Sequence, residues 1–239
     1  MIDDADTTSG GVGVVVVAAG TGSRLGAGGP KAFVRLAGRP LLGHALDTVA
    51  RVPGLRSVAV VVPADLTDGT GPQWEGITLP PGTRLVAGGP ERAESVAAGL
   101  AVLDAGCDVV LVHDAARCLT PLAVFERVVA AVREGTAGAT GAVPGMPVVD
   151  TVKTVDSQGL ITGTPARAAL RAVQTPQGFR HDVLVAAYRS GAVATDDAAL
   201  VERMGHKVLV VEGDQLAFKV TLPPDLDHAE RLVEAARLH

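Results

Sequence analysis

The chain has 239 residues, of which 47% are hydrophobic and only 3% aromatic, and its formal net charge is −5 at neutral pH. This length suits one domain with its own core, and a small acidic charge without a long basic run argues against a general nucleic-acid-binding protein. The most apolar early run, 12–19, is too short to span a bilayer, and residues 1–11 are acidic and polar, unlike a secretory signal. We therefore expect a cytoplasmic protein with no nucleic-acid or membrane partner, in which a disordered tail, 1–11, precedes a single domain, 12–239.

Strands and helices alternate in the first half of the chain. The β-branched run 14–17 predicts a strand buried on both faces, and a glycine-rich loop follows it. Apolar periodicity then predicts helix 40–50, strand 57–62, short strand 83–87, helix 91–104, strand 108–113 and helix 121–134, with a surface loop at 67–82. Such alternation predicts βαβ units, hence an α/β fold with a Rossmann-like, mostly parallel sheet flanked by helices.

The pattern changes after residue 139. Short β-rich pieces punctuated by prolines run from 140 to 177, and they predict an inserted β-arm at about 145–175. Two short helices, strands 207–211 and 217–221, and a closing helix from about Pro224 complete the prediction.

The loop after the first strand lies where open α/β sheets bind ligands, beyond the carboxyl ends of the strands. Gly20 and Gly22 let backbone N–H groups approach phosphate oxygens. The loop is not a dinucleotide fingerprint, because Leu25 occupies the position of the third glycine, and it lacks the Gly-Lys-Ser/Thr of a Walker loop. The cations Arg24 and Lys31 beside such an anion-binding loop suit a triphosphate.

The motif AAGTGSR at 18–24, followed by Pro-Lys at 30–31, resembles the nucleotidyltransferase family that activates sugars as nucleoside diphosphates. In that family the loop embraces the triphosphate and the two cations neutralise it. The resemblance implies nucleotide-binding roles for Ala18, Ala19, Gly20, Thr21, Gly22 and Ser23, and catalytic roles for Arg24 and Lys31.

The segment GGPERAES at 88–95 reads as a turn that leads into a helix. It resembles the cytosine-binding segment of cytidylyltransferases, which implies that Gly89, Pro90 and Ser95 contact the base. Pro90 has no N–H to donate, so backbone groups around Gly89 and the hydroxyl of Ser95 are the expected contacts.

The segment VHDAAR at 112–117 ends a buried strand at the same edge of the sheet. There Asp114 can hold Mg²⁺ or a substrate hydroxyl, and Arg117 can face a phosphate. His113 points to the opposite face and is expected to be structural. Ala115 is counted with the nucleotide-binding residues. Cys118 stands where the family usually has proline, and it and Cys107 form no CxxC pair.

Together these motifs resemble the family of cytidylyltransferases that act on 2-C-methyl-D-erythritol 4-phosphate in isoprenoid biosynthesis. In that family a β-arm crosses to the neighbouring subunit, which implies a homodimer here. The implied substrate-binding residues are Asp114, Arg117, Thr151, Arg167, Thr175 and Thr195, and Lys219 is a further catalytic residue.

The implied reaction transfers CMP from CTP to the phosphate of the acceptor and releases pyrophosphate, with Mg²⁺ as cofactor. The acceptor phosphate is already ionised, so no general base is needed, and the chain shows no Ser/His/Asp constellation. Two alternatives stay open at this point: a ribitol 5-phosphate cytidylyltransferase, with the same chemistry, and a non-catalytic nucleotide-binding regulator.

Overall fold

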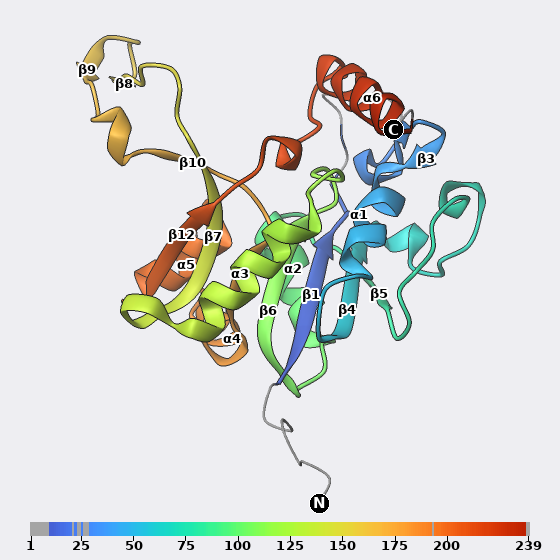
Figure 1. Ribbon diagram of the computed structural model, residues 1–239. Coiled ribbons are helices and arrows are strands. Elements are labelled where there is room, and N and C mark those ends of the chain that lie inside the picture. Colours follow the sequence, from blue (N-terminus) through green and yellow to red (C-terminus); the bar gives the residue numbers. More distant parts are fainter. Residues whose placement is uncertain (1–9, 21, 23–24, 26–28, 193, 238–239) are drawn as a thin grey trace, which may run out of the picture.

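A computed structural model describes residues 10–20, 22, 25, 29–192 and 194–237, and one large sheet forms its centre (Figure 1). The strands run in the order β10-β7-β11-β6-β1-β4-β5, and β12 also pairs with β7. Their bounds are β1 Gly11–Val17, β4 Leu55–Val62, β5 Arg84–Ala87, β6 Cys107–Asp114, β7 Ala139–Pro147, β10 Arg171–Val173, β11 Gln177–Arg180 and β12 Lys207–Glu212. Strands β4, β1 and β6 are mutually parallel and only β10 and β11 run against their neighbours, which confirms the predicted mostly parallel sheet.

Helices cover both faces of this sheet. Helices α1 (Leu41–Val49) and α3 (Leu122–Glu134) pack on one face. Helices α2 (Arg92–Ala101), α4 (His181–Arg189) and α5 (Asp197–Arg203) pack on the other. The run of valines in β1 explains how one strand serves both layers: alternate side chains enter opposite clusters, and all but the partly buried Val17 are fully buried.

Smaller elements lie around this core. Helix α6 (Pro223–Arg237) packs through Ala229 against a separate apolar cluster near the start of α1. Two two-stranded sheets add β2 (Arg35–Leu36) with β3 (Arg39–Pro40), and β8 (Thr154–Val155) with β9 (Ile161–Gly163). Short 3₁₀ turns occupy Lys31–Phe33, Ala64–Leu66, Pro72–Trp74, Thr136–Gly138, Arg167–Ala169 and Gln215–Ala217. Among the described residues, no helix combines the length and apolar character needed to cross a membrane.

The stretch predicted as an arm divides into two parts. Strand β7 belongs to the central sheet, where it is paired with β12 along 139–145 and with β11 at 141–142. Strand β10 closes back on 145–147 of the same strand. The segment that projects from the body is therefore the part between 147 and 171, which carries β8 and β9 (Figure 1). Two prolines, Pro144 and Pro147, lie within β7, and the strand nevertheless pairs with neighbours on both sides.

Two predicted boundaries were wrong. Residues 217–221 do not form a strand: Asp214 caps a 3₁₀ turn by accepting from the Leu216 N–H at 2.8 Å, and Val220 makes only one backbone bond, to the Ala116 carbonyl. Gly11, predicted to lie in the tail, already begins β1 and bonds to the Gly106 carbonyl at 3.1 Å. The rest of the predicted tail, 1–9, lies outside the described residues.

Candidate active site

The carboxyl ends of β1, β4, β5 and β6 meet at one edge of the sheet, and a cavity of about 390 Å³ opens there. The loop after β1, the turn before α2 and the end of β6 supply its walls. Of the predicted site residues, those that line it are Ala18, Ala19, Gly20, Lys31, Gly89, Pro90, Ser95, Asp114, Ala115 and Lys219. Segments separated by up to two hundred residues thus converge as the sequence predicted.

The glycine loop closes on itself beside this cavity. The Lys31 N–H donates to the Gly20 carbonyl at 3.1 Å, and the Leu25 N–H donates to the Gly22 carbonyl at 2.9 Å. Gly22 has φ +65°, and a Cβ there would lie 2.5 Å from the Lys31 Cβ, so only glycine fits. The loop therefore returns Lys31 to the cavity. Thr21, Ser23 and Arg24, which we also predicted in the site, lie outside the described residues.

The second wall is the turn that leads into α2. A Cβ on Gly88 would lie 2.4 Å from the Ala19 Cβ, so a glycine lets this turn pack directly on the β1 loop. Ser95 is only 3% exposed, and its hydroxyl donates to the Gly89 carbonyl at 3.4 Å. Backbone groups and one hydroxyl thus face the cavity from this side, and these are groups that can read a base edge.

A carboxylate with two cations forms the floor of the cavity. Asp114 ends β6, and its Oδ2 accepts from the Lys219 Nζ at 2.7 Å, while its Oδ1 lies 3.4 Å from the Arg92 Nε. Burial by itself raises the pKa of Asp114, but the charges of Lys219 and Arg92 outweigh it and hold the pKa at about 2. Asp114 is consequently ionised at neutral pH.

Both lysines predicted as catalytic reach the cavity. Lys219 lies in the segment before α6, which bonds to the end of β6 through the Val220 N–H and the Ala116 carbonyl and through Lys219 and Asp114. The Lys31 Nζ donates to the Thr221 hydroxyl at 3.4 Å, so the two lysines approach from the first and last parts of the chain. An anion in this cavity would meet both ammonium groups.

The structure places Thr175 and His113 behind the cavity. Thr175 is 4% exposed, and its hydroxyl accepts from the Asp114 N–H at 3.0 Å and lies 3.1 Å from the His113 Nδ1. His113 packs against the Phe125 ring, and burial lowers its pKa to about 4, which fits the structural role predicted for it. Thr175 fixes the backbone of Asp114 and does not line the cavity within this chain.

Arg117 does not face the cavity either. Its Nη1 donates to the Ala217 carbonyl at 2.7 Å and its Nη2 lies 3.4 Å from the Val173 carbonyl. Burial lowers the pKa of this guanidinium, and its Nε has no hydrogen-bond partner. In this structure Arg117 ties together the segments that flank the site, and its contact with a phosphate stays a prediction.

The remaining predicted residues lie away from the cavity. Thr151 and Arg167 are exposed on the projecting segment, where Arg167 donates to the Val149 carbonyl. Thr195 is exposed just before α5. The fold of one chain does not bring these three side chains to Asp114.

Sequence reasoning gave no individual role to Arg92, Asp197 or Tyr188, although Asp197 lies in the segment 195–197, which resembles a substrate-lining segment of the family. Arg92 lines the cavity and forms a bidentate ion pair with the fully buried Asp197, with nitrogen–oxygen distances of 3.1 and 2.8 Å. The Tyr188 hydroxyl also donates to Asp197. Arg92 lies inside the motif at 88–95, but nothing in the sequence shows that its partner follows 105 residues later.

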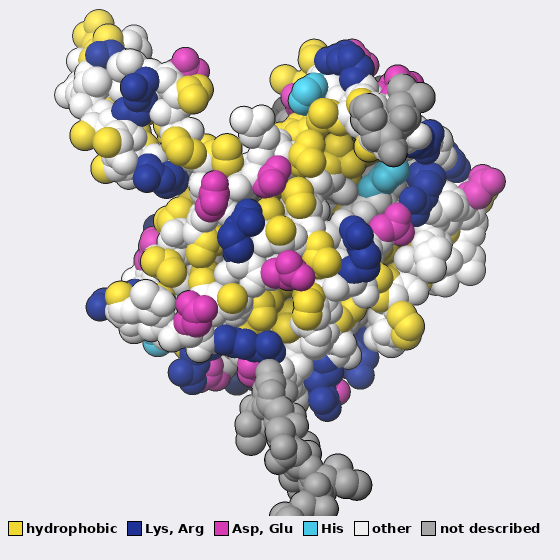
Figure 2. Space-filling view, in the orientation of Figure 1, with side chains coloured by type: hydrophobic (Ala, Val, Ile, Leu, Met, Phe, Trp, Pro, Cys, Tyr) yellow, Lys and Arg dark blue, Asp and Glu magenta, His cyan; other side chains and the backbone are white. Residues whose placement is uncertain are grey.

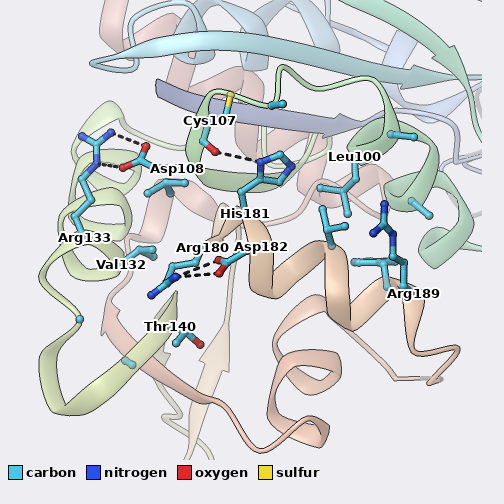
Figure 3. Close-up of a pocket in the computed structure, with 18 of the residues that line it drawn as sticks. Leu100, Cys107, Asp108, Val132, Arg133, Thr140, Arg180, His181, Asp182 and Arg189 are labelled. Atoms are coloured by element: carbon cyan, nitrogen blue, oxygen red, sulfur yellow. Dashed lines mark hydrogen bonds and ion pairs between the residues drawn. The ribbon is translucent and has the colours of Figure 1, made fainter. Parts of the chain in front are cut away.

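A second and larger cavity, of about 1010 Å³, opens at the amino-terminal edge of the sheet between α2, α3 and α4 (Figure 3). Two ion pairs lie on its wall, Arg133 with Asp108 at 3.1 Å and Arg180 with Asp182 at 2.9 Å, and Arg189 also lines it. None of the predicted site residues lines it. Its size alone does not make it the site, because it lies at the edge of the sheet opposite to that where open α/β sheets bind ligands.

Comparisons with known proteins identify the family of this chain. A family model described as 2-C-methyl-D-erythritol 4-phosphate cytidylyltransferase, IspD, matches residues 12–235. A protein of that name from Nocardia farcinica is 50% identical over 236 residues, covering 98% of each chain. Another from Rhodococcus jostii is 50% identical over 222 residues, covering 92% of this chain and 94% of the relative.

Solved structures agree with the fold. The 4-diphosphocytidyl-2C-methyl-D-erythritol synthase of Anaerococcus prevotii matches with a TM-score of 0.81 and 27% identity, covering 94% of this chain and 96% of that one. The 2-C-methyl-D-erythritol 4-phosphate cytidylyltransferase of Thermus thermophilus matches with a TM-score of 0.75 and 35% identity, covering 94% and 99%. The family model and the close relatives agree over nearly the whole chain, so this chain belongs to the 2-C-methyl-D-erythritol 4-phosphate cytidylyltransferase family.

Proposed function

We propose that the cavity at the carboxyl edge of the sheet is where this chain transfers CMP from CTP to 2-C-methyl-D-erythritol 4-phosphate. The observation that carries the proposal is the convergence of the glycine loop, Lys31, Lys219 and Asp114 on one cavity. A glycine loop with two ammonium groups suits a triphosphate, and an ionised carboxylate beside them suits a metal ion or a hydroxyl.

In the proposed reaction an oxygen of the acceptor phosphate attacks the α-phosphorus of CTP. A new P–O bond forms there, the bond between the α-phosphorus and the bridging oxygen breaks, and pyrophosphate leaves with that oxygen's electron pair. The nucleophile is already ionised, so the protein has to align two polyanions and neutralise charge at the α-phosphate. We assign the charge-neutralising role to Lys31 and Lys219, with Arg24 on the triphosphate.

Asp114 is the residue that would hold Mg²⁺ together with the phosphates of the nucleotide. Its carboxylate fits this role, because it is ionised and borders the cavity. Among the described residues there is no cluster of three or more metal-binding side chains, and Mg²⁺ commonly uses one or two carboxylates and keeps water and phosphate oxygens as its other ligands. When bound, the ion supplies extra positive charge at the phosphates.

Cytosine would lie against the turn before α2, where we propose contacts from the backbone of Gly89 and from Ser95. Because Pro90 has no N–H, the donors available at this turn are fewer than its length suggests. Ala18, Ala19 and Ala115 would contact the nucleotide through their backbones.

We also propose a homodimer in which the projecting segment reaches the partner's site. The apolar side chains of Val149, Val155, Leu160 and Ile161 are between 57% and 79% exposed on that segment, which is typical of a surface that a partner covers. Thr151 and Arg167 lie on the same segment, far from the cavity of their own chain, and could meet the acceptor phosphate of the other subunit. A cytoplasmic setting is proposed because Cys107 and Cys118 are free thiols.

Two other functions were open at the sequence level. The relatives at 50% identity are named for 2-C-methyl-D-erythritol 4-phosphate, which does not favour ribitol 5-phosphate as the acceptor. A regulator without catalysis would not need Lys31 and Lys219, and both are present at the cavity.

Pyrophosphate release tests the proposed substrates directly. The purified chain is assayed with each of the four nucleoside triphosphates and with the two polyol phosphates as acceptors. We expect release with CTP and 2-C-methyl-D-erythritol 4-phosphate and little with the other combinations. Faster release with ribitol 5-phosphate, or with UTP in place of CTP, would overturn the substrate assignment.

A further inference from the structure

The carboxylate of Asp197 is fully buried at the first position of α5, behind the wall of the active-site cavity. It accepts two hydrogen bonds from the guanidinium of Arg92 and one from the hydroxyl of Tyr188. A buried charge destabilises the fold unless it is paired in this way. Burial and the charge of Asp197 raise the pKa of Tyr188, so its hydroxyl stays protonated and can donate.

This pair extends into the site through the third nitrogen of Arg92. A guanidinium is planar, so holding its two Nη atoms on Asp197 also fixes the direction of its Nε. That Nε lies 3.4 Å from Oδ1 of Asp114, while Lys219 holds Oδ2 at 2.7 Å. Each oxygen of Asp114 therefore faces one cation, and the ion pair with Asp197 fixes the position of Arg92, the cation at Oδ1.

The start of α5 is itself anchored. The Asp196 side chain caps the helix by accepting from the Ala199 N–H at 3.0 Å. The Gln177 side chain, on β11, donates to Asp196 at 2.9 Å and accepts from the Ala198 N–H at 3.1 Å. The position of Asp197 is thus set by the central sheet and not by a surface loop.

We propose that Asp197 is a positioning residue for the reaction: it holds Arg92 in the one orientation that leaves Asp114 shared between Arg92 and Lys219. Without the charge of Asp197, the two Nη atoms of Arg92 are free to form their own pair with Asp114 and to displace Lys219 from it. The inference rests on the proposed roles of Asp114 and Lys219.

A double-mutant cycle tests whether Asp197 acts through Arg92. The variants are Asp197→Asn, which keeps the shape and removes the charge, Arg92→Met, which keeps an unbranched side chain, and both together. We expect each single change to lower kcat/KM for CTP about tenfold, and the double variant to be no worse than Arg92→Met. A double variant whose loss equals the product of the two single losses would overturn the proposal.

Thermal unfolding of the same variants supplies a second readout. Arg92→Met leaves a buried carboxylate unpaired, so it should unfold at the lowest temperature, and adding Asp197→Asn should recover part of the loss. If Arg92→Met does not fold, the cycle is run with Tyr188→Phe, which keeps the ion pair and removes one hydrogen bond. Tyr188→Phe should lower kcat two- to threefold alone and not at all in the Asp197→Asn background; a further loss in that background contradicts the proposal.

Two controls separate this inference from the proposed function. Asp182→Asn removes an exposed acid on α4 that pairs only with Arg180, and it should leave kcat/KM unchanged. If Lys219→Ala is strongly impaired while Asp197→Asn equals the wild type, only the positioning role fails. If Lys219→Ala is fully active, the proposed function fails first, whatever Asp197 does.

Discussion

The cavity at the carboxyl edge and the larger cavity at the amino-terminal edge differ in how their charges are arranged. At the amino-terminal edge, in the larger cavity, Arg133 and Arg180 each pair with a partly exposed acid, Asp108 and Asp182. At the carboxyl edge, Asp114 is shared by cations from distant parts of the chain, and the lysine that it binds stays partly exposed towards the cavity. An arginine and an acid that pair one to one neutralise each other. A carboxylate that is shared by two cations can instead release one of them to an incoming phosphate.

The space-filling view agrees with a molecule whose surface charges are scattered. Lys, Arg, Asp and Glu side chains alternate over the body with no large single-sign field on the visible face (Figure 2). Attraction of a triphosphate therefore has to come from a local cluster, because the whole molecule carries a net negative charge. The glycine loop and its lysines provide such a cluster.

The largest expected effect comes from the lysines of the smaller cavity. Lys31→Ala and Lys219→Ala should each lower kcat by ~10²–10³, because each removes a donor placed at the reacting phosphate. Steady-state kinetics with CTP and 2-C-methyl-D-erythritol 4-phosphate measure this. Lys207→Ala, at a lysine that bonds only to the Ala137 carbonyl at the other edge, is the matched control. Near-normal turnover in Lys31→Ala or Lys219→Ala would contradict the assignment of the smaller cavity as the active site.

The projecting segment should give an effect of intermediate size. Arg167→Ala should raise KM for the acceptor about tenfold with little change in KM for CTP, since a charged hydrogen bond to phosphate contributes roughly 1.5–3 kcal/mol. Lys153→Ala, on the same segment and bonded to the Thr164 hydroxyl, is the control. An unchanged KM in Arg167→Ala would argue that this segment does not take part in the reaction.

Mixed dimers extend that test to the partner subunit. When Arg167→Ala and Lys31→Ala chains are mixed and allowed to exchange, one site in each mixed dimer should contain both intact residues. Some activity should therefore return. Absence of recovery, with exchange verified by mass, would indicate that each site is built from one chain.

The smallest effect is expected in the larger cavity. Arg180→Gln removes an exposed ion pair with Asp182, and such pairs contribute about 0–1 kcal/mol to stability. We expect kcat within twofold of the wild type and a slightly lower midpoint in urea unfolding. A large loss of activity would show that the two cavities are functionally linked, for which the side chain of Tyr188 offers a route because it borders the larger cavity and bonds to Asp197.

Much of the site could be predicted because its residues follow directly from strand ends. A run of valines predicts a buried strand, so the glycine loop after it had to lie at the carboxyl edge, and the same argument placed Asp114 there. The family resemblance then supplied Lys219, which no local pattern identifies, and the fold brings it within 2.7 Å of Asp114.

What could not be predicted depends on packing between distant elements. Arg92 and Asp197 meet because α2 and α5 cover the same face of the sheet, which no local pattern encodes. Arg117 turns towards the Ala217 and Val173 carbonyls because two loops leave acceptors beside it, although its place in the motif suggested a phosphate. The strand predicted at 217–221 failed for a related reason: its apolar residues pack, but no neighbouring strand pairs with them.

Hydrogen exchange with and without CTP and Mg²⁺ tests most directly where the nucleotide binds. Because bound phosphates and base would engage the backbone of the smaller cavity, peptides that contain Gly20, Gly89 and Ala115 should exchange more slowly with the nucleotide present. Peptides covering 133–140 and 180–189, at the larger cavity, should exchange at unchanged rates. Slower exchange confined to the larger cavity would contradict the account.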